Sequence, residues 1–292
     1  MSPRAEGTLM TEDGSTFAKR YGPWALVAGA SDGVGAAYAR AMAERGINVV
    51  LIARRQQVLD EVAETIRAAT GAQTRTLAVD LAAAGATAEI ADATADLEIG
   101  MLMYCAGADP AYQPFLASTI DSALSLVQRN CVVPMQLCHH FAPAMAARGM
   151  GGIVLVGSGA GLVGAPNMVA YGATKAFGMV MAEGLWSELH GSGVDVLGLI
   201  LGTTDTPALR RLLAARGVLA SAADTSPIPG ALTPEETVAE AIASLPHGPT
   251  YFVGERTRQG AAHLAGMTRN DAVNLLIRSG GGIMRSDREQ PA

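Results

Sequence analysis

The sequence has few cysteines, little charge and no long apolar run. Cys105, Cys131 and Cys138 are its three thiols; they form no Cys-x-x-Cys spacing, and no histidine is placed to complete a zinc site. We expect them to be reduced and structural. The pair His139-His140 does not indicate a metal either, because adjacent helical residues do not face one another. The sequence therefore predicts no metal site.

No stretch reaches the roughly 18 uncharged apolar residues of a membrane-spanning helix, so no span is expected. The net charge is -6 and the pI is near 5.4, which argues against nucleic acid or an anionic membrane as a partner, since both favour a basic surface. Residues 1–21 carry several charges and no apolar segment of signal-peptide length. We expect 1–21 to be a flexible arm and the location to be cytoplasmic.

Hydrophobic residues form the largest class in the composition. Of 292 residues, 49% are hydrophobic and 16% are charged. A chain of this size can bury one large core. The low fraction of charged residues predicts that further surface is buried between subunits, as in a homodimer or homotetramer.

Short apolar runs alternate with helical patterns, and this βαβ rhythm predicts an α/β fold with a doubly wound sheet of about seven parallel strands and helices on both faces. The pattern Thr233-Pro234-Glu235-Glu236 predicts a capped helix start. One domain is expected over 22–255, and 256–292 form a C-terminal extension, helical and then a flexible tail, for subunit contacts or a pocket edge. Strands are expected at 24–28, 48–52, 74–79, 99–104, 153–157, 194–200 and 250–253, with helices over 56–70, 119–148 and 169–190 among others.

The most informative pair is Tyr171 and Lys175, which stand four residues apart and so share one helix face. Ser158 lies upstream, at the end of an apolar run. An ammonium beside a phenol favours the phenolate, so the tyrosine pKa is expected to fall from its ordinary value of about 10. This triplet can carry out proton chemistry at an oxygen atom.

A glycine-rich turn, Gly29-Ala30-Ser31-Asp32-Gly33-Val34-Gly35, joins the first expected strand to a helix. Glycines there let the backbone approach a pyrophosphate, and the new helix points its free amides at the anion. The Gly-x-x-x-Gly-x-Gly spacing departs from the usual Gly-x-Gly-x-x-Gly fingerprint. By itself this turn is weak evidence for a nucleotide site.

Together, the two segments resemble the short-chain dehydrogenase/reductase family, which has Thr-Gly-x-x-x-Gly-x-Gly near its start and Ser and Tyr-x-x-x-Lys in its middle. The resemblance covers about residues 24–206, and its Rossmann-type fold agrees with the strand pattern. Three positions depart from the family: Ala28 replaces Thr, Tyr104-Cys105 replaces Asn-Asn, and Leu201 replaces Pro. These departures affect cofactor walls more than the chemistry.

The resemblance implies hydride transfer between a nicotinamide cofactor and a ketone, aldehyde or alcohol. Tyr171 would exchange the proton, Lys175 would lower its pKa and hold the nicotinamide ribose, and Ser158 would orient the substrate oxygen. Asn130 would place a relay water. Implied cofactor contacts are Gly29, Ser31, Asp32, Gly33, Val34, Gly35, Arg54, Arg55, Asp80, Leu81, Cys105, Ala106, Gly107, Tyr171, Lys175, Gly202, Thr204 and Thr206.

The residues at the end of the second expected strand indicate which nicotinamide cofactor is preferred. Ala53 stands where NAD-preferring members carry Asp, and Arg54 and Arg55 follow it. Because arginine accommodates the 2'-phosphate, NADP(H) is favoured over NAD(H). Asp32 is a contrary sign, since NADP-preferring relatives often have a basic residue in that turn.

Residues 207–232 are rich in Ala and Leu and would close over the substrate, which favours a small apolar ketone or alcohol. The sequence does not distinguish steroid, fatty acyl and small ring ketones. Arg210, Arg211 and Arg216 either meet an acidic or acyl-thioester group or face water. Two other functions are kept open. Gly29 to Gly33 also matches the Gly-x-Ser-x-Gly elbow of serine hydrolases, with Ser31 as nucleophile, and a dinucleotide-binding sensor would keep the pocket without turnover.

Overall fold

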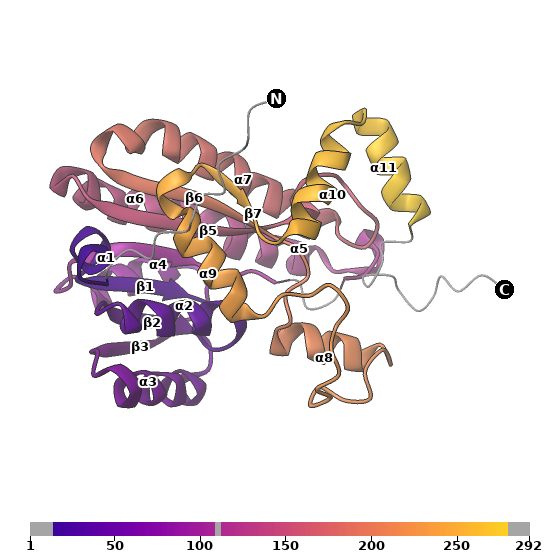
Figure 1. Ribbon diagram of the computed structural model, residues 1–292. Coiled ribbons are helices and arrows are strands. Elements are labelled where there is room, and N and C mark those ends of the chain that lie inside the picture. The colour runs from indigo at the N-terminus through magenta and orange to yellow at the C-terminus, as the bar shows by residue number, and fades with distance from the viewer. Residues whose placement is uncertain (1–13, 109–111, 280–292) are drawn as a thin grey trace, which may run out of the picture.

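The computed structural model describes residues 14–108 and 112–279. Seven parallel strands form one sheet in the order β3-β2-β1-β4-β5-β6-β7 (Figure 1). This confirms the predicted fold class, and the predicted strand ends are displaced by at most two residues. The strands are β1 (Trp24–Ala28), β2 (Asn48–Ala53), β3 (Thr74–Ala78), β4 (Ile99–Tyr104), β5 (Gly151–Ser158), β6 (Val194–Leu201) and β7 (Thr250–Phe252).

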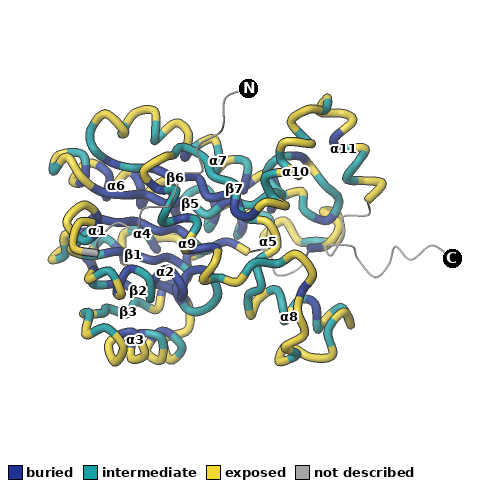
Figure 2. The backbone as a smooth tube through the Cα atoms, viewed as in Figure 1, coloured by how far each residue is buried: buried dark blue, intermediate teal, exposed yellow. Residues whose placement is uncertain are grey.

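Each face of the sheet is covered by its own set of helices and has its own apolar core. In β1, Ala25 and Val27 join the core shared with α2, α3 and α9, whereas Leu26 and Ala28 join the core shared with α4, α6 and α7. A strand buried on both faces reads as a continuous apolar run. Figure 2 shows the buried strands inside a partly exposed helical shell. These helices are α2 (Gly33–Glu44), α3 (Gln56–Thr70), α4 (Ala86–Ala93), α6 (Val133–Arg148), α7 (Val169–Leu189) and α9 (Pro234–Ser244).

The flexible arm predicted for 1–21 is wrong for its last part, and residues 1–13 lie outside the described residues. Gly14–Tyr21 form helix α1, with Phe17 and Tyr21 buried in the core. The Tyr21 hydroxyl donates to Asp195 Oδ2 over 2.6 Å, at the start of β6. Arg20 pairs with the same carboxylate at 2.6 Å. Helix α1 thus covers the amino ends of the strands, on the left in Figure 1.

The single helix predicted for 119–148 is divided into three parts. Helix α5 (Ile120–Val127) leads into a π-helical segment, η2 (Gln128–Val132), which leads into α6. Pro134, the second residue of α6, has no N–H and so removes one helical donor close to the end of η2. A π-helical turn within a helix often marks a functional site, and η2 contains Asn130.

Three helices lie beyond the carboxyl ends of the strands, on the right in Figure 1. Helix α8 (Pro207–Ala215) begins the expected lid, and α10 (Glu255–Ala265) and α11 (Arg269–Arg278) form the described part of the C-terminal extension. The capping box predicted at Thr233 is confirmed, because the Glu236 N–H donates to Thr233 Oγ1 and the Thr233 N–H donates to the Glu236 carboxylate. None of the described helices is long and apolar enough to cross a bilayer.

Candidate active site

The residues predicted to act in a site follow the carboxyl ends of successive strands. Because parallel strands end at one edge of a sheet, residues far apart in sequence come together there. The strand order reverses between β1 and β4, and this is where a crevice forms in such sheets. The predicted residues there are Gly29 to Gly35 after β1, Arg54 and Arg55 after β2, Asp80 and Leu81 after β3, Cys105 to Gly107 after β4, Ser158 ending β5, and Gly202, Thr204 and Thr206 after β6.

The glycine-rich turn packs too closely for side chains. A Cβ at Gly29, whose φ is 89°, would lie 2.8 Å from the Ala106 nitrogen, and a Cβ at Gly35 would overlap the Gly29 carbonyl oxygen. The backbone N–H of Gly29 donates to Ile52 O over 2.8 Å, which fixes the turn to β2. The glycines therefore allow the tight turn that lets the backbone approach a pyrophosphate in sites of this kind.

Not every predicted contact residue faces open space. Leu81 is buried in the core with α4, and the Asp80 carboxylate accepts the N–H of Ala82 over 3.0 Å. Thr206 caps α8, since its Oγ1 accepts the N–H of Leu209, and Thr204 forms an isolated bridge with Leu232. Arg54 is exposed at the end of β2.

Tyr171 and Lys175 lie together on the first turns of α7. Lys175 Nζ is 5.7 Å from the centre of the Tyr171 ring, and the two residues are 8% and 6% exposed. Nζ donates to the carbonyl oxygen of Val156 in β5 over 2.9 Å. Burial lowers the pKa of Lys175 to about 8, and Arg129 adds to this effect, while Cys105 and Cys131 oppose it. Within the described ranges no carboxylate forms an ion pair with Lys175.

Asn130 is tied to the same helix. Its Nδ2 donates to Thr174 Oγ1 over 2.9 Å and to Gly107 O over 3.1 Å, and Thr174 in turn donates to Tyr171 O. Its Oδ1 is buried and has no hydrogen-bond partner among the described residues. An unpaired buried acceptor costs about 1–3 kcal/mol, so this atom is ready to accept a hydrogen bond. Thr174 was missed in the sequence, although it lies inside the Tyr-x-x-x-Lys motif.

Ser158 ends β5, and its Oγ accepts the N–H of Ala160 over 3.2 Å, capping the short turn Gly159–Gly161. Since Oγ accepts in this bond, its own O–H remains able to donate. The serine therefore fills the capping role and keeps a donor at the carboxyl edge.

An apolar cluster surrounds Tyr171, and the sequence did not predict it. The Tyr112 ring meets the Tyr171 ring edge-on at a centroid distance of 5.5 Å, and Leu126 of α5 completes the buried part of the cluster. Leu212 of α8 packs against it. The Arg216 guanidinium donates to Tyr112 O over 3.1 Å, so the lid is connected to this wall.

The other lid arginines are also engaged. Arg210 makes a bidentate pair with Asp205, at 2.7 and 2.5 Å, and donates to the carbonyl oxygen of Asp224, which holds the loop after α8. Arg211 reaches Asp32 in the glycine-rich turn, with 3.1 Å between Nη2 and Oδ2. Arg55 approaches the same Oδ2 at 3.5 Å. The structure thus joins the lid to the turn after β1.

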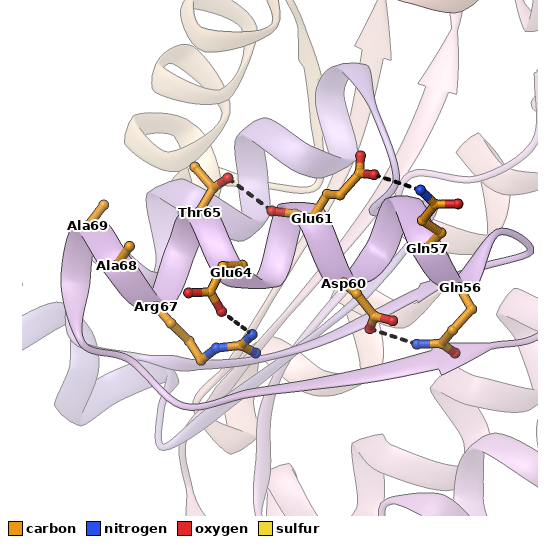
Figure 3. Close-up of a pocket in the computed structure, with 9 residues that line it drawn as sticks. All are labelled: Gln56, Gln57, Asp60, Glu61, Glu64, Thr65, Arg67, Ala68 and Ala69. Carbon is orange, nitrogen blue, oxygen red and sulfur yellow. Dashed lines mark hydrogen bonds and ion pairs between the residues drawn. The ribbon is translucent and has the colours of Figure 1, made fainter.

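Figure 3 shows the side chains that line a broad, open hollow along α3, and none of the predicted site residues is among them. Its lining comes from one helix, and the polar side chains pair with one another: Gln56 with Asp60 over 2.8 Å, and Arg67 with Glu64 over 2.6 Å. No groups from different elements converge there, so we assign it no function. A much smaller cavity lies beside Lys175, Asn130 and Thr174.

The three cysteines are free thiols. Burial raises the pKa of Cys105 and of Cys138 to about 12, which keeps both protonated and unreactive at neutral pH. No group of three His, Cys, Asp or Glu side chains that could hold a metal ion occurs among the described residues.

A family model described as short chain dehydrogenase matches residues 23–217, more than half of the chain. The chain belongs to the short-chain dehydrogenase/reductase family. It is 31% identical to a 7beta-hydroxysteroid dehydrogenase of Clostridium sardiniense over 264 residues, covering 89% of this chain and 96% of that protein.

Two solved structures of the family are similar to this one. The first, from work on 7beta-hydroxysteroid dehydrogenase stereoselectivity, has a TM-score of 0.80 and 30% identity, covering 89% of this chain and 98% of the other. The second, a short-chain dehydrogenase of Sphingobium yanoikuyae in complex with NADPH, has a TM-score of 0.71 and 28% identity, covering 92% and 98%.

Family membership makes this protein an oxidoreductase that acts on CH–OH or C=O groups and binds a nicotinamide dinucleotide. Neither alternative from the sequence is supported by these matches. The hydrolase interpretation of Ser31 and the sensor without turnover both lack a counterpart among the relatives described.

Proposed function

We propose that the protein interconverts a ketone and a secondary alcohol by hydride transfer with NADP(H), and that Tyr171 exchanges the proton at the substrate oxygen. The observation that carries this proposal is the buried Lys175 ammonium 5.7 Å from the Tyr171 ring. A nearby ammonium stabilises the phenolate relative to the phenol, so the hydroxyl can donate and recover a proton near neutral pH.

The neighbouring groups have complementary tasks in this mechanism. Ser158 donates its O–H to the substrate oxygen and orients it beside Tyr171. Asn130 holds a water through the unpaired Oδ1, and this water returns protons to the Tyr171 and Lys175 pair. Lys175 uses one donor on Val156 O and keeps its other N–H groups for the nicotinamide ribose. The nicotinamide supplies the hydride when it is bound.

The residues at the carboxyl edge fit such a dinucleotide. A Cβ at Gly29 or Gly35 would collide with neighbouring backbone, so these glycines allow the tight turn of a pyrophosphate site, and Gly107 leaves room for Asn130 Oδ1. Arg54 and Arg55 stand where the adenosine ribose is read, and arginine there favours a 2'-phosphate. The relative that binds NADPH supports the same preference.

For the substrate, we propose a bulky apolar ketone or alcohol of fused rings, such as a steroid. The apolar cluster of Tyr112, Leu126 and Leu212 beside Tyr171 suits a flat apolar surface. The relatives named 7beta-hydroxysteroid dehydrogenase support this class. The three free thiols suit a reducing compartment, and we propose the cytoplasm.

We further propose that the protein is a homo-oligomer, a dimer or tetramer, built on helices α5 and α7. These helices pack on each other and expose large apolar side chains, which a second copy would cover. A Val180→Asp variant that stays at the wild-type mass in light scattering would contradict this interface. The exposed residues are Ile120, Leu124 and Val127 on α5 and Val169, Phe177 and Val180 on α7.

The test is a titration of the full chain with NADPH and NADH, followed by nicotinamide fluorescence, and then an absorbance assay with a panel of steroid and smaller ketones. Tight NADPH binding with turnover of fused-ring ketones is the expected result. Binding of neither nucleotide would overturn the cofactor proposal. Turnover of small ketones alone would contradict the proposed substrate class, whereas the proposed hydride-transfer reaction would still hold.

A further inference from the structure

Asp32 is the meeting point of two arginines from distant parts of the chain. Arg55 follows β2, and Arg211 lies on the lid helix α8, yet both direct Nη2 at the same oxygen, Asp32 Oδ2, at 3.5 and 3.1 Å. Asp32 precedes α2 but its carboxylate accepts no capping hydrogen bond there. The carboxylate instead pairs with the two guanidinium groups.

Two guanidinium groups converging on one oxygen form an arrangement better matched to a phosphate than to a single carboxylate. Guanidinium binds phosphate oxygens through parallel N–H donors, and a phosphate offers more oxygens and more charge. All three side chains are partly exposed, 30% for Asp32, 56% for Arg55 and 54% for Arg211. Such exposed pairs are weak and exchange readily.

The position of the cluster identifies the phosphate. Arg55 lies two residues beyond the end of β2, in the region where sheets of this kind bind the 2' position of the adenosine ribose. Arg211 is held next to it because Thr206, which caps α8, lies against the glycine-rich turn: a Cβ on Gly33 would be 3.0 Å from Thr206 Cγ2. The lid helix therefore starts at the turn that carries Asp32.

We propose that Arg211 is a specificity-determining residue for NADP(H): together with Arg55 it binds the 2'-phosphate, and Asp32 holds the two arginines in position until the nucleotide arrives. This inference rests on the proposed function. It also explains how a turn with an acidic residue serves a phosphorylated cofactor, because the lid supplies the cation that the turn lacks.

The same helix meets the substrate side. Leu212, the next residue, packs against the cluster of Tyr112 and Tyr171. One turn of α8 thus touches the phosphate end of the nucleotide through Arg211 and the catalytic tyrosine through Leu212. A phosphorylated nucleotide would fix the lid over the substrate wall, and an unphosphorylated one would not.

The experiment measures the dissociation constants of NADPH and NADH for the full-length wild type, Arg211→Gln and Arg211→Lys. Arg211→Gln should weaken NADPH binding about 10- to 100-fold, the range for losing a charge-assisted hydrogen bond, and NADH binding less than about twofold. Arg211→Lys should fall between, because lysine keeps the charge but not the parallel donors.

Arg40→Gln is the matched control, because Arg40 is also a partly exposed arginine in an ion pair, with Glu235 at 3.0 Å. It should leave both constants unchanged. If the wild type prefers NADPH and Arg211→Gln changes both nucleotides equally or neither, the role of Arg211 is wrong while the proposed cofactor stands. If the wild type binds NADPH no more tightly than NADH, the proposed cofactor preference is wrong. The wild-type dissociation constants alone give that result, before any variant is measured.

Discussion

At the amino ends of the strands, Tyr21 donates to the Asp195 carboxylate, and Arg20 pairs with it. The end of α1 also packs closely against Gly100 and Gly152, where a side chain would not fit. At the carboxyl ends, and counting only the residues that the structure describes, Asn130 Oδ1 has no hydrogen-bond partner and buried Lys175 has no carboxylate counter-ion. At the amino ends of the sheet the polar groups are therefore paired and close-packed, whereas at the carboxyl ends some polar groups still need a partner. The first arrangement stabilises the fold, and the second leaves donors and acceptors available for ligands.

The largest effect is expected at the carboxyl end. Tyr171→Phe removes the proposed acid, so kcat should fall on the order of 10² to 10⁴-fold, while the NADPH dissociation constant should remain within about threefold. Steady-state kinetics with a ketone that the wild type reduces, together with a fluorescence titration, provide both numbers. Unchanged turnover would exclude Tyr171 as the proton donor.

The matching change at the amino end should cost stability instead. Tyr21→Ala removes a fully buried ring and should lower the free energy of unfolding by about 3–5 kcal/mol, measured by urea denaturation. Tyr21→Phe removes only the hydroxyl from an ionised partner and should cost about 1.5–3 kcal/mol. Both should keep the wild-type kcat where they are folded, and a large loss of kcat would show that the two ends are coupled.

The buried Lys175 at the carboxyl ends of the strands should also make the stability of the protein depend on pH. Burial lowers the pKa of Lys175 to about 8, below the ordinary 10.5 that it regains on unfolding. Between these values the unfolded chain binds more protons than the native one, so Lys175 makes stability rise with pH over this window, by on the order of 3 kcal/mol. Lys175→Met should lack that contribution, which urea denaturation of both proteins at pH 7 and pH 10 would measure. Parallel pH profiles would contradict a desolvated ammonium.

The smallest effect is expected for Thr233, which follows the bridge between Thr204 and Leu232 at the carboxyl edge but belongs to a complete capping box. Thr233→Ala should cost about 1 kcal/mol of unfolding free energy and leave kcat unchanged. A loss of activity here would mean that the edge as a whole, and not the group around Tyr171, determines turnover.

Much of the fold could be predicted because its information is local. Strands buried on both faces, such as Asn48–Ala53, are continuous apolar runs that need no tertiary knowledge to recognise. Helix α1 was missed because eight residues do not form a stable helix alone; its stability comes from burying Phe17 and Tyr21 against strands later in the chain. The three-part helix after residue 119 depends on packing in the same way.

The site divides along the same line. Tyr171 and Lys175 could be found because they are four residues apart, and Thr233 because its cap lies within three. Arg211 could be placed in the expected lid, but its pairing with Asp32 could not be predicted, since the two residues are 179 apart in the sequence. Tyr112 could not be identified from the sequence either, because its contact with the Tyr171 ring exists only in the folded protein.

The π-helical segment Gln128–Val132 makes the geometry of the site depend on chain length as well as on side-chain identity. Each residue of an α-helix turns the chain by about 100°, so a helix that lost one residue here would rotate α5 relative to α6 by about that angle. Asn130 could then point to Gly107 and Thr174 only at the expense of the packing of α6. A one-residue deletion in this segment should therefore abolish turnover more completely than Asn130→Ala, although every residue named in the mechanism would still be present.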